Sequence, residues 1–139
     1  MTAPAVPPGA AALAGDIRRG QVTRIRSAIL FADMRGYTHL TDALTPEASV
    51  ELLNTYFDCL VPPIESEGGE VLKYMGDGLL AIFRESGDDL GGAAQGALTA
   101  AQTALRRVEE ANRAGRFPTR IEIGIALHHG EAAYGNVGS

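Results

Sequence analysis

The sequence predicts an α+β domain with a ferredoxin-like split βαβ sandwich, in which two long helices cover one face of a mainly antiparallel sheet. Short apolar runs of strand length alternate with two longer segments whose apolar residues recur at helical spacing. The two middle runs are separated only by the glycine turn at residues 76–78, which is typical of a β-hairpin. The resulting β-α-β-β-α-β order is the split βαβ pattern.

Length and composition limit the kinds of function. The chain has 139 residues, enough for one domain with a single core. Its net charge of −5 at pH 7 is unfavourable for binding nucleic acid, which requires a basic surface. The single cysteine, Cys59, cannot form an internal disulfide, and no apolar run approaches the length of a membrane span. Since no signal peptide pattern is seen, we expect a cytoplasmic protein that contacts neither nucleic acid nor a membrane through this segment.

Residues 1–25 are expected to be a flexible lead or linker, because residues 1–14 are rich in proline, alanine and glycine. The arginine-rich residues 16–26 are interpreted as a solvent-exposed segment that leads into the first strand. The alternative is an element that couples the domain to another one. The linker composition makes an upstream sensor domain a possible partner.

The first half of the core is expected to start with a buried strand over residues 26–34, followed by a short helix over residues 37–44. Thr45 is the expected N-cap of a second helix. The adjacent Pro62 and Pro63 are expected to kink that helix or end it. The apolar residues that keep helical spacing along it are Val50, Leu53, Phe57, Leu60 and Ile64.

The second half is expected to hold the hairpin over residues 68–83 and a helical block over residues 88–115 with Gly115 as its C-cap. The last segment, residues 119–139, is expected to form a strand, a turn at His129-Gly130 and the start of a further strand. The residues expected to share the apolar face of the helical block are Leu98, Ala101, Leu105 and Val108.

Two aspartates carry the first functional argument. Asp33 ends the first strand and Asp77 lies at the hairpin tip, and each alone is more simply a turn former. In the expected topology these strands are neighbours, so the two carboxylates meet at one edge and need a compensating cation. Oxygen ligands favour Mg²⁺ or Mn²⁺, and two such ions about 3.5–4 Å apart act in displacement at phosphorus. A helix start with a glycine follows at residues 36–38, where free amides suit an anion, so the pattern indicates nucleoside triphosphate chemistry.

Three segments then carry a family resemblance. "FADMRGYT" and "LKYMGDGLLAIF" resemble the two metal-site motifs of the class III nucleotidyl cyclases, the adenylate and guanylate cyclase catalytic domain. "IEIGIALHHGEAAYGNVGS" is similar to a third segment of that family, and the three occur in family order. The resemblance covers residues 26–139 and identifies that region as the catalytic domain.

The resemblance implies a role for each matching residue. Asp33 and Asp77 would bind two Mg²⁺ or Mn²⁺ ions, with the backbone carbonyl of Met34 as a further ligand. Lys73 would contact the purine and favour ATP over GTP, although on its own it is more simply an exposed strand lysine. The site would form across a head-to-tail homodimer, with Lys73 of one chain serving the nucleotide held by the other. The residues that would bind the triphosphate through backbone amides are Gly36, Tyr37 and Thr38.

The implied reaction is attack of the ribose 3′-oxygen on the α-phosphorus of ATP, giving 3′,5′-cyclic AMP and pyrophosphate. The family domain extends beyond the last matching segment, where it carries a second purine-reading residue and an Asn and an Arg that stabilise the transition state. Residues 26–139 are therefore expected to lack the C-terminal part of the domain and to be nearly inactive alone.

Two alternatives remain open. One is a non-catalytic module or fragment that binds nucleotide or mediates dimerisation. The other is a palm-type nucleotidyl transferase, although Gly76-Asp77-Gly78 lacks the second adjacent acid typical of diguanylate cyclases. The acidic chain also argues against binding a template strand.

Overall fold

The computed structural model describes residues 22–85 and 91–135, so residues 1–21 of the expected lead over residues 1–25, the loop at 86–90 and residues 136–139 lie outside the described residues. The described elements are β1 (Val22–Met34), α2 (Tyr37–Thr41), α3 (Pro46–Ser66), β2 (Glu70–Met75), β3 (Gly78–Arg84), α4 (Gly92–Arg113) and β4 (Ile123–Gly135). None of the described helices is both long and apolar enough to cross a membrane.

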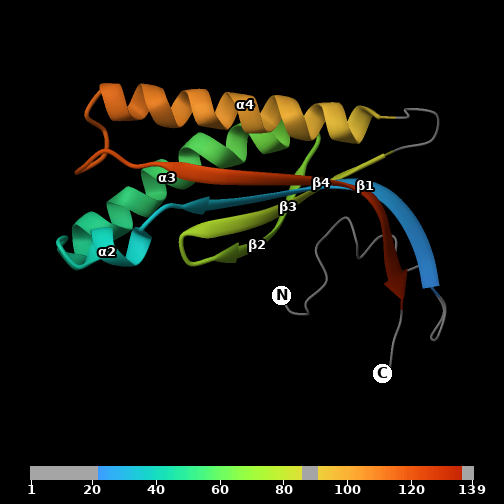
Figure 1. The fold of residues 1–139 in the computed structure, drawn as a ribbon, viewed down its shortest axis with the longest axis horizontal. Coiled ribbons are helices and arrows are strands. Elements are labelled where there is room, and N and C mark those ends of the chain that lie inside the picture. Colours follow the sequence, from blue (N-terminus) through green and yellow to red (C-terminus); the bar gives the residue numbers. More distant parts are fainter. Residues whose placement is uncertain (1–21, 86–90, 136–139) are drawn as a thin grey trace.

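The four strands form one sheet in the order β2-β3-β1-β4, and each neighbouring pair is antiparallel. Both long helices, α3 and α4, lie on the same face of this sheet (Figure 1). The predicted fold class is therefore confirmed, including the prediction that the first strand pairs with the hairpin.

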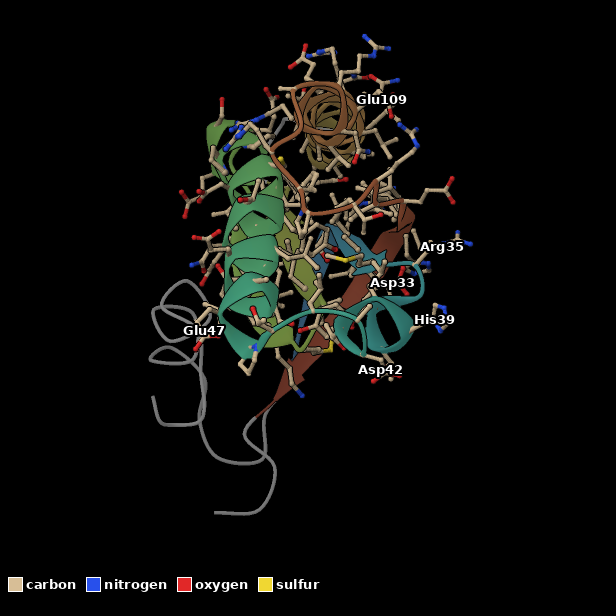
Figure 2. All side chains as sticks on the ribbon, turned by 90° about the vertical axis from the view of Figure 1, so that its left-hand side faces the viewer. Asp33, Arg35, His39, Asp42, Glu47 and Glu109 are labelled. Atoms are coloured by element: carbon tan, nitrogen blue, oxygen red, sulfur yellow. The ribbon has the colours of Figure 1, made fainter. Side chains whose placement is uncertain are left out.

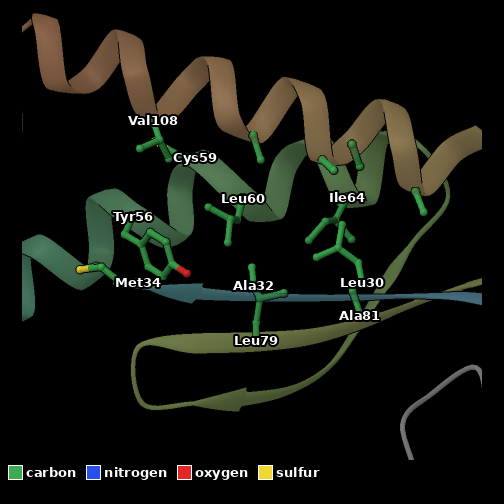
Figure 3. Close-up of a cluster of buried hydrophobic side chains, with 14 of the residues drawn as sticks. Leu30, Ala32, Met34, Tyr56, Cys59, Leu60, Ile64, Leu79, Ala81 and Val108 are labelled. Atoms are coloured by element: carbon green, nitrogen blue, oxygen red, sulfur yellow. The ribbon is translucent and has the colours of Figure 1, made fainter. Parts of the chain in front are cut away.

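The core lies between the sheet and the two long helices. Alternate residues of β1, from Ala28 to Met34, are buried towards the helices, because successive side chains of a strand point to opposite faces. Leu52, Tyr56 and Leu60 of α3 recur at intervals of four residues and are buried. Figure 3 shows Tyr56 and Leu60 pointing from α3 towards the sheet.

The face of α4 that contacts the core is made mostly of small residues. Ala97, Ala100 and Ala104 are buried, which lets this helix approach the sheet closely. Ala101 and Val108 are buried as expected. Leu98 and Leu105 were expected on the same face, but 42% and 46% of their surfaces are exposed, so that expectation is wrong.

Two prolines lie inside α3. The helix continues through Pro62 and Pro63 to Ser66, so these prolines do not end it. Proline has no amide hydrogen, and Pro62 therefore leaves the carbonyl oxygen of Asp58 without its helical donor. Nη2 of Arg107 on α4 donates a hydrogen bond to this oxygen across 2.8 Å. A contact between helices thus replaces the backbone bond that the sequence removes.

β4 corrects the expected turn at His129-Gly130. It is one continuous strand, and Gly130 pairs with Ser27 in the middle of the ladder. β1 begins at Val22, four residues before the expected strand, and so provides partners along the whole of β4. Pairing with a neighbouring strand outweighs the local turn preference of a glycine.

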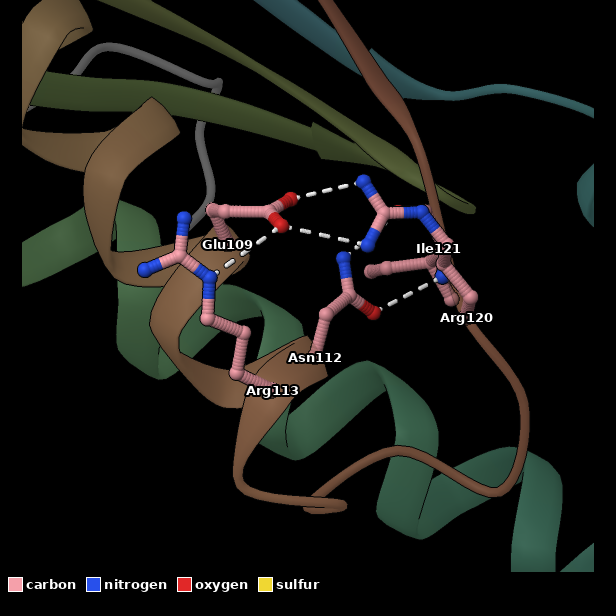
Figure 4. Close-up of polar contacts among 5 residues, drawn as sticks. All are labelled: Glu109, Asn112, Arg113, Arg120 and Ile121. Atoms are coloured by element: carbon pink, nitrogen blue, oxygen red, sulfur yellow. Dashed lines mark hydrogen bonds and ion pairs between the residues drawn. The ribbon is translucent and has the colours of Figure 1, made fainter.

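The C-terminal end of α4 is fastened to the start of β4. Gly115 adopts φ 69°, and the amide of Arg116 donates to the carbonyl of Ala111, which is the Schellman pattern expected for a glycine stop. The Asn112 side chain then donates to the carbonyl of Ile121 at 2.8 Å and accepts from its amide at 2.9 Å (Figure 4). These bonds hold the chain that leads into β4 against the helix.

Candidate active site

The structure brings Asp33 and Asp77 together at one end of the sheet. Asp33 pairs with Gly78, the residue directly after Asp77, in the β1·β3 ladder. The amide of Met34 donates to the carbonyl oxygen of Asp77 across 3.2 Å. The backbone positions of both aspartates are therefore fixed by the register of two adjacent strands, as the sequence predicted.

Two glycines allow this close approach of the hairpin to β1. Gly76 has φ 59°, a left-handed conformation that makes the tight turn before Asp77 possible. A Cβ atom at Gly78 would lie 2.6 Å from the carbonyl oxygen of Ala32, well inside contact distance. Any larger residue at position 78 would push the hairpin away from the end of β1.

Asp33 lies on the face of the sheet opposite the helices, next to Arg35. A Cβ atom at Gly124 of β4 would lie 2.8 Å from Nη2 of Arg35 and 3.1 Å from Oδ1 of Asp33. The guanidinium and the carboxylate thus both lie against this glycine. Among the described residues they form no ion pair with each other, and Arg35 has no other acidic partner. A depression of about 190 Å³ opens beside them, lined also by Phe31 and Ala126.

The loop between β1 and α2 follows directly. Gly36 has φ 65° and ψ 28° and precedes Tyr37, the first residue of α2. In the part of the chain that the structure describes, the amides of Tyr37 and Thr38 donate no backbone hydrogen bond. The expected triphosphate-binding residues are therefore placed with free donors within a few residues of Asp33.

Polar side chains lie around this loop. The residues that line a depression of about 280 Å³ here include Gly36, Arg35, His39, Arg120 and Glu122. Figure 2 shows Asp33, Arg35 and His39 at the same end of the molecule. Arg120 is held by a bidentate contact with Glu109 of α4, at 2.8 and 3.2 Å (Figure 4). Arg120 is thus already paired with an acidic side chain, whereas Arg35 has no such partner among the described residues.

Lys73 lies on β2, and its side chain is exposed. It pairs with Leu80 of β3, which pairs with Phe31 of β1, so Lys73 lies on the same face of the sheet as Asp33. Two strand spacings separate β2 from β1, about 10 Å in total. Lys73 is thus apart from the two aspartates but shares their open face.

Tyr56 on α3 is a residue of this region that the sequence analysis did not single out. Its side chain is fully buried, and its hydroxyl has no hydrogen-bond partner among residues 22–85 and 91–135. Burial raises its pKa, and the negative charges of Asp77 and Asp33 raise it further. The spacing of Tyr56 from Leu52 and Leu60, four residues on each side, could have identified it as a buried residue.

The available ligands fit a small divalent cation of the Mg²⁺ type. Among the described residues, no histidine, cysteine or third acidic side chain joins Asp33 and Asp77. Two carboxylates with a backbone carbonyl from the end of β1 leave most of the coordination sphere to water and phosphate oxygens, as Mg²⁺ prefers. Zinc would favour nitrogen and sulfur ligands, which are absent from this group.

Comparisons with known proteins find matches over most of the chain. The family model described as "Adenylate and Guanylate cyclase catalytic domain" matches residues 22–139. An adenylate cyclase of Anabaena cylindrica is 34% identical over 129 residues, which cover 88% of this chain and 24% of the relative. A terminal-differentiation specific adenylate cyclase of Dictyostelium discoideum is 31% identical over 80% of this chain and 5% of the relative.

Solved structures show the same likeness. The guanylyl cyclase Cya2 superposes with a TM-score of 0.71 at 31% identity, covering 84% of this chain and 60% of that one. The adenylyl cyclase CyaB of P. aeruginosa superposes with a TM-score of 0.73 at 25% identity, covering 86% and 63%. The chain thus spans about three fifths of these structures and a quarter or less of the two cyclase sequences above.

Proposed function

The chain belongs to the adenylate and guanylate cyclase catalytic domain family, and on that premise we propose that it binds ATP with two divalent cations for conversion to 3′,5′-cyclic AMP and pyrophosphate. The observation that carries the proposal is the pairing of Asp33 with Gly78, which brings Asp77 to the end of β1, directly before the Gly36 loop. Two carboxylates beside free amides can hold a cation and a triphosphate at the same time.

Asp33, Asp77 and the carbonyl of Met34 would hold the cations. When bound, Mg²⁺ or Mn²⁺ supplies Lewis acidity to the ribose 3′-hydroxyl and neutralises charge on the leaving pyrophosphate. The protein holds the backbone of Asp33 and Asp77 in place before substrate binds, because the register of the strands fixes it. Such preorganisation avoids rearrangement during the reaction.

The Gly36 loop would orient the triphosphate. The free amides of Tyr37 and Thr38 suit β- and γ-phosphate oxygens, and Gly36 has no side chain to block their approach. Arg35 adds a cationic group between the carboxylates and the loop. Its guanidinium suits phosphate oxygens better than a lysine would, because it presents several donors in one plane.

Lys73 would read the purine of a nucleotide held by a second copy of the chain, in a head-to-tail homodimer. Its ammonium can donate to the N1 acceptor of adenine but not to the N1–H of guanine, which favours ATP. The location of Lys73 on the same open face as Asp33, about two strand spacings away, supports a dimer that meets across this face.

Two experiments test the proposal, a measurement of nucleotide binding and an analysis of the reaction products. The 139-residue chain should bind ATP only when Mn²⁺ is present, and GTP should compete weakly. Radiolabelled ATP is then incubated with the chain alone and with a separately expressed C-terminal piece of a class III cyclase domain, and the products are separated by chromatography. Cyclic AMP that appears mainly on complementation supports the proposal. Metal-independent ATP binding, or a linear nucleotidyl product, would refute it.

A further inference from the structure

The hydroxyl of Tyr56 is a buried polar group without a partner. The side chain is 0% exposed, and its oxygen makes no hydrogen bond in the part of the chain that the structure describes. Buried tyrosine hydroxyls usually have a partner, because an unpaired one loses its hydration without compensation. Packing alone does not explain the choice of tyrosine here, since phenylalanine would fill the same space.

The position of the ring relates this hydroxyl to the candidate metal site. Figure 3 shows the Tyr56 ring reaching from α3 to the end of β1, next to Met34. The ring is supported on α3 by Phe57, whose centroid lies 5.0 Å away. Met34 directly follows Asp33 on β1, and its amide donates to the carbonyl oxygen of Asp77 across 3.2 Å. The Tyr56 ring therefore packs on the core side of the segment that carries Asp33 and contacts Asp77.

Asp77 is the candidate partner, because its backbone is bonded to Met34, which lies next to the Tyr56 ring. It is half-buried in the turn between β2 and β3, and its carboxylate forms no hydrogen bond or ion pair within the described residues. Its backbone is fixed through the bond to Met34. A tyrosine hydroxyl carries its proton at neutral pH and can therefore donate a hydrogen bond.

We propose that Tyr56 is a positioning residue of the metal site, and that its hydroxyl donates a hydrogen bond to a carboxylate oxygen of Asp77, directly or through one water, when cations are bound. This inference rests on the proposed function. A carboxylate that binds a metal through one oxygen keeps the other free to accept such a bond. Groups that hydrogen-bond metal ligands in this way commonly contribute about 10–100-fold to metal affinity.

The test compares Tyr56→Phe with Tyr74→Phe. Tyr74 is a suitable control because it also packs against Phe57, at 5.0 Å, but is 55% exposed. Mn²⁺ binding is followed by the electron paramagnetic resonance signal of free Mn²⁺, and stability by urea unfolding without metal. Tyr56→Phe should weaken Mn²⁺ binding about 10-fold or more without lowering metal-free stability, and Tyr74→Phe should change neither.

A comparison with Asp77→Asn separates the possible outcomes. Mn²⁺ affinity in Tyr56→Phe should lie between those of wild type and Asp77→Asn, because Tyr56→Phe removes one hydrogen bond and leaves both carboxylates in place. Unchanged Mn²⁺ affinity in Tyr56→Phe alone would overturn the inference and leave the proposed function standing. A loss of metal-free stability in that variant would also overturn it, by showing that the hydroxyl already has a partner. A wild-type chain that binds Mn²⁺ no better than Asp77→Asn would refute the proposed metal site and this inference with it.

Discussion

The backbone amide of Met34 donates to the carbonyl oxygen of Asp77 across 3.2 Å, which joins the end of β1 to the turn of the hairpin. Through this bond and the pairing of Asp33 with Gly78, the spacing of the two carboxylates depends on sheet register and not on contacts between side chains. Changes to the carboxylates should therefore alter ligand binding with little effect on folding, whereas changes to the backbone contact should alter both.

Asp33→Asn and Asp77→Asn should each abolish Mn²⁺ binding, because the described residues offer no third acidic group to replace either one. Stability should remain the same or rise slightly, since each change removes one of two neighbouring like charges. Mn²⁺ titration and urea unfolding measure the two effects. Asp42→Asn is the control, because Asp42 is exposed at the end of α2 on the same end of the molecule (Figure 2). A variant at 33 or 77 that keeps wild-type Mn²⁺ affinity would contradict the assignment.

Gly78→Ala should destabilise the protein by about 1–3 kcal/mol and weaken Mn²⁺ binding, because the new Cβ would meet the backbone oxygen of Ala32 at 2.6 Å. Gly124→Ala is the matched comparison. Its Cβ would meet Nη2 of Arg35 at 2.8 Å, but this is the end of a long, movable side chain, so the loss of stability should be much smaller. Urea unfolding ranks the two variants, and equal losses would show that the hairpin is not held at this point.

Lys73→Glu should weaken the use of ATP relative to GTP in a complete cyclase assembly while leaving the fold intact, since the side chain is exposed. The measurement is the ratio of kcat/KM for the two nucleotides. Glu51→Lys, an exposed charge reversal on α3, serves as the control. Unchanged selectivity in Lys73→Glu would show that Lys73 is only an exposed strand lysine.

Asn112→Ala should destabilise the protein by about 1–3 kcal/mol, because it leaves the amide and the carbonyl of Ile121 without their partners in a partly buried position. Gln102→Ala on the exposed side of α4 is the control and should stay close to wild type. Thermal or urea unfolding measures the loss. If the two variants lost the same stability, the contact in Figure 4 would have no energetic role.

Stability should depend on Glu85 at acid pH. The hydrogen bond from His129, together with that from Arg26, lowers the pKa of the Glu85 carboxyl in the folded protein. A carboxyl with a lowered folded pKa stabilises the fold at pH values above its unfolded pKa of about 4.3, and this contribution is lost as the pH falls through the folded value. Glu85→Gln should therefore lose less stability than wild type when the pH is lowered from neutral to about 3.

Urea midpoints at both pH values measure this difference. Glu51→Gln should behave as wild type, because the Glu51 side chain is exposed and has no partner among the described residues. An identical acid-induced loss in Glu85→Gln and wild type would show that the contact with His129 does not contribute to stability.

Much of the fold could be predicted because its signals are local. Strand and helix periods, the glycine hairpin and the Thr45 cap, whose hydroxyl accepts from the amide of Ala48 at 3.1 Å, each depend on neighbouring residues. The sequence also located Asp33 and Asp77 at the ends of adjacent strands, since strand order follows from the order of elements. Errors arose where a partner distant in sequence decides the outcome. β4 passes through His129-Gly130 because β1 pairs with it there, and Leu98 lies outside the core because alanines fill the space between α4 and the sheet.

The sequence by itself determined the order of elements, the fold class and the residue types at the candidate site. Tertiary structure alone decided which groups come together there: Arg35 and Asp33 both lie against Gly124, and the buried Tyr56 hydroxyl has no hydrogen-bond partner among the described residues. The physical reason is that the two kinds of interaction act over different distances along the sequence. Periodicity and turn chemistry act over a few residues, whereas contacts between β1, β4 and α3 bring together positions that are tens of residues apart, and no local preference specifies them.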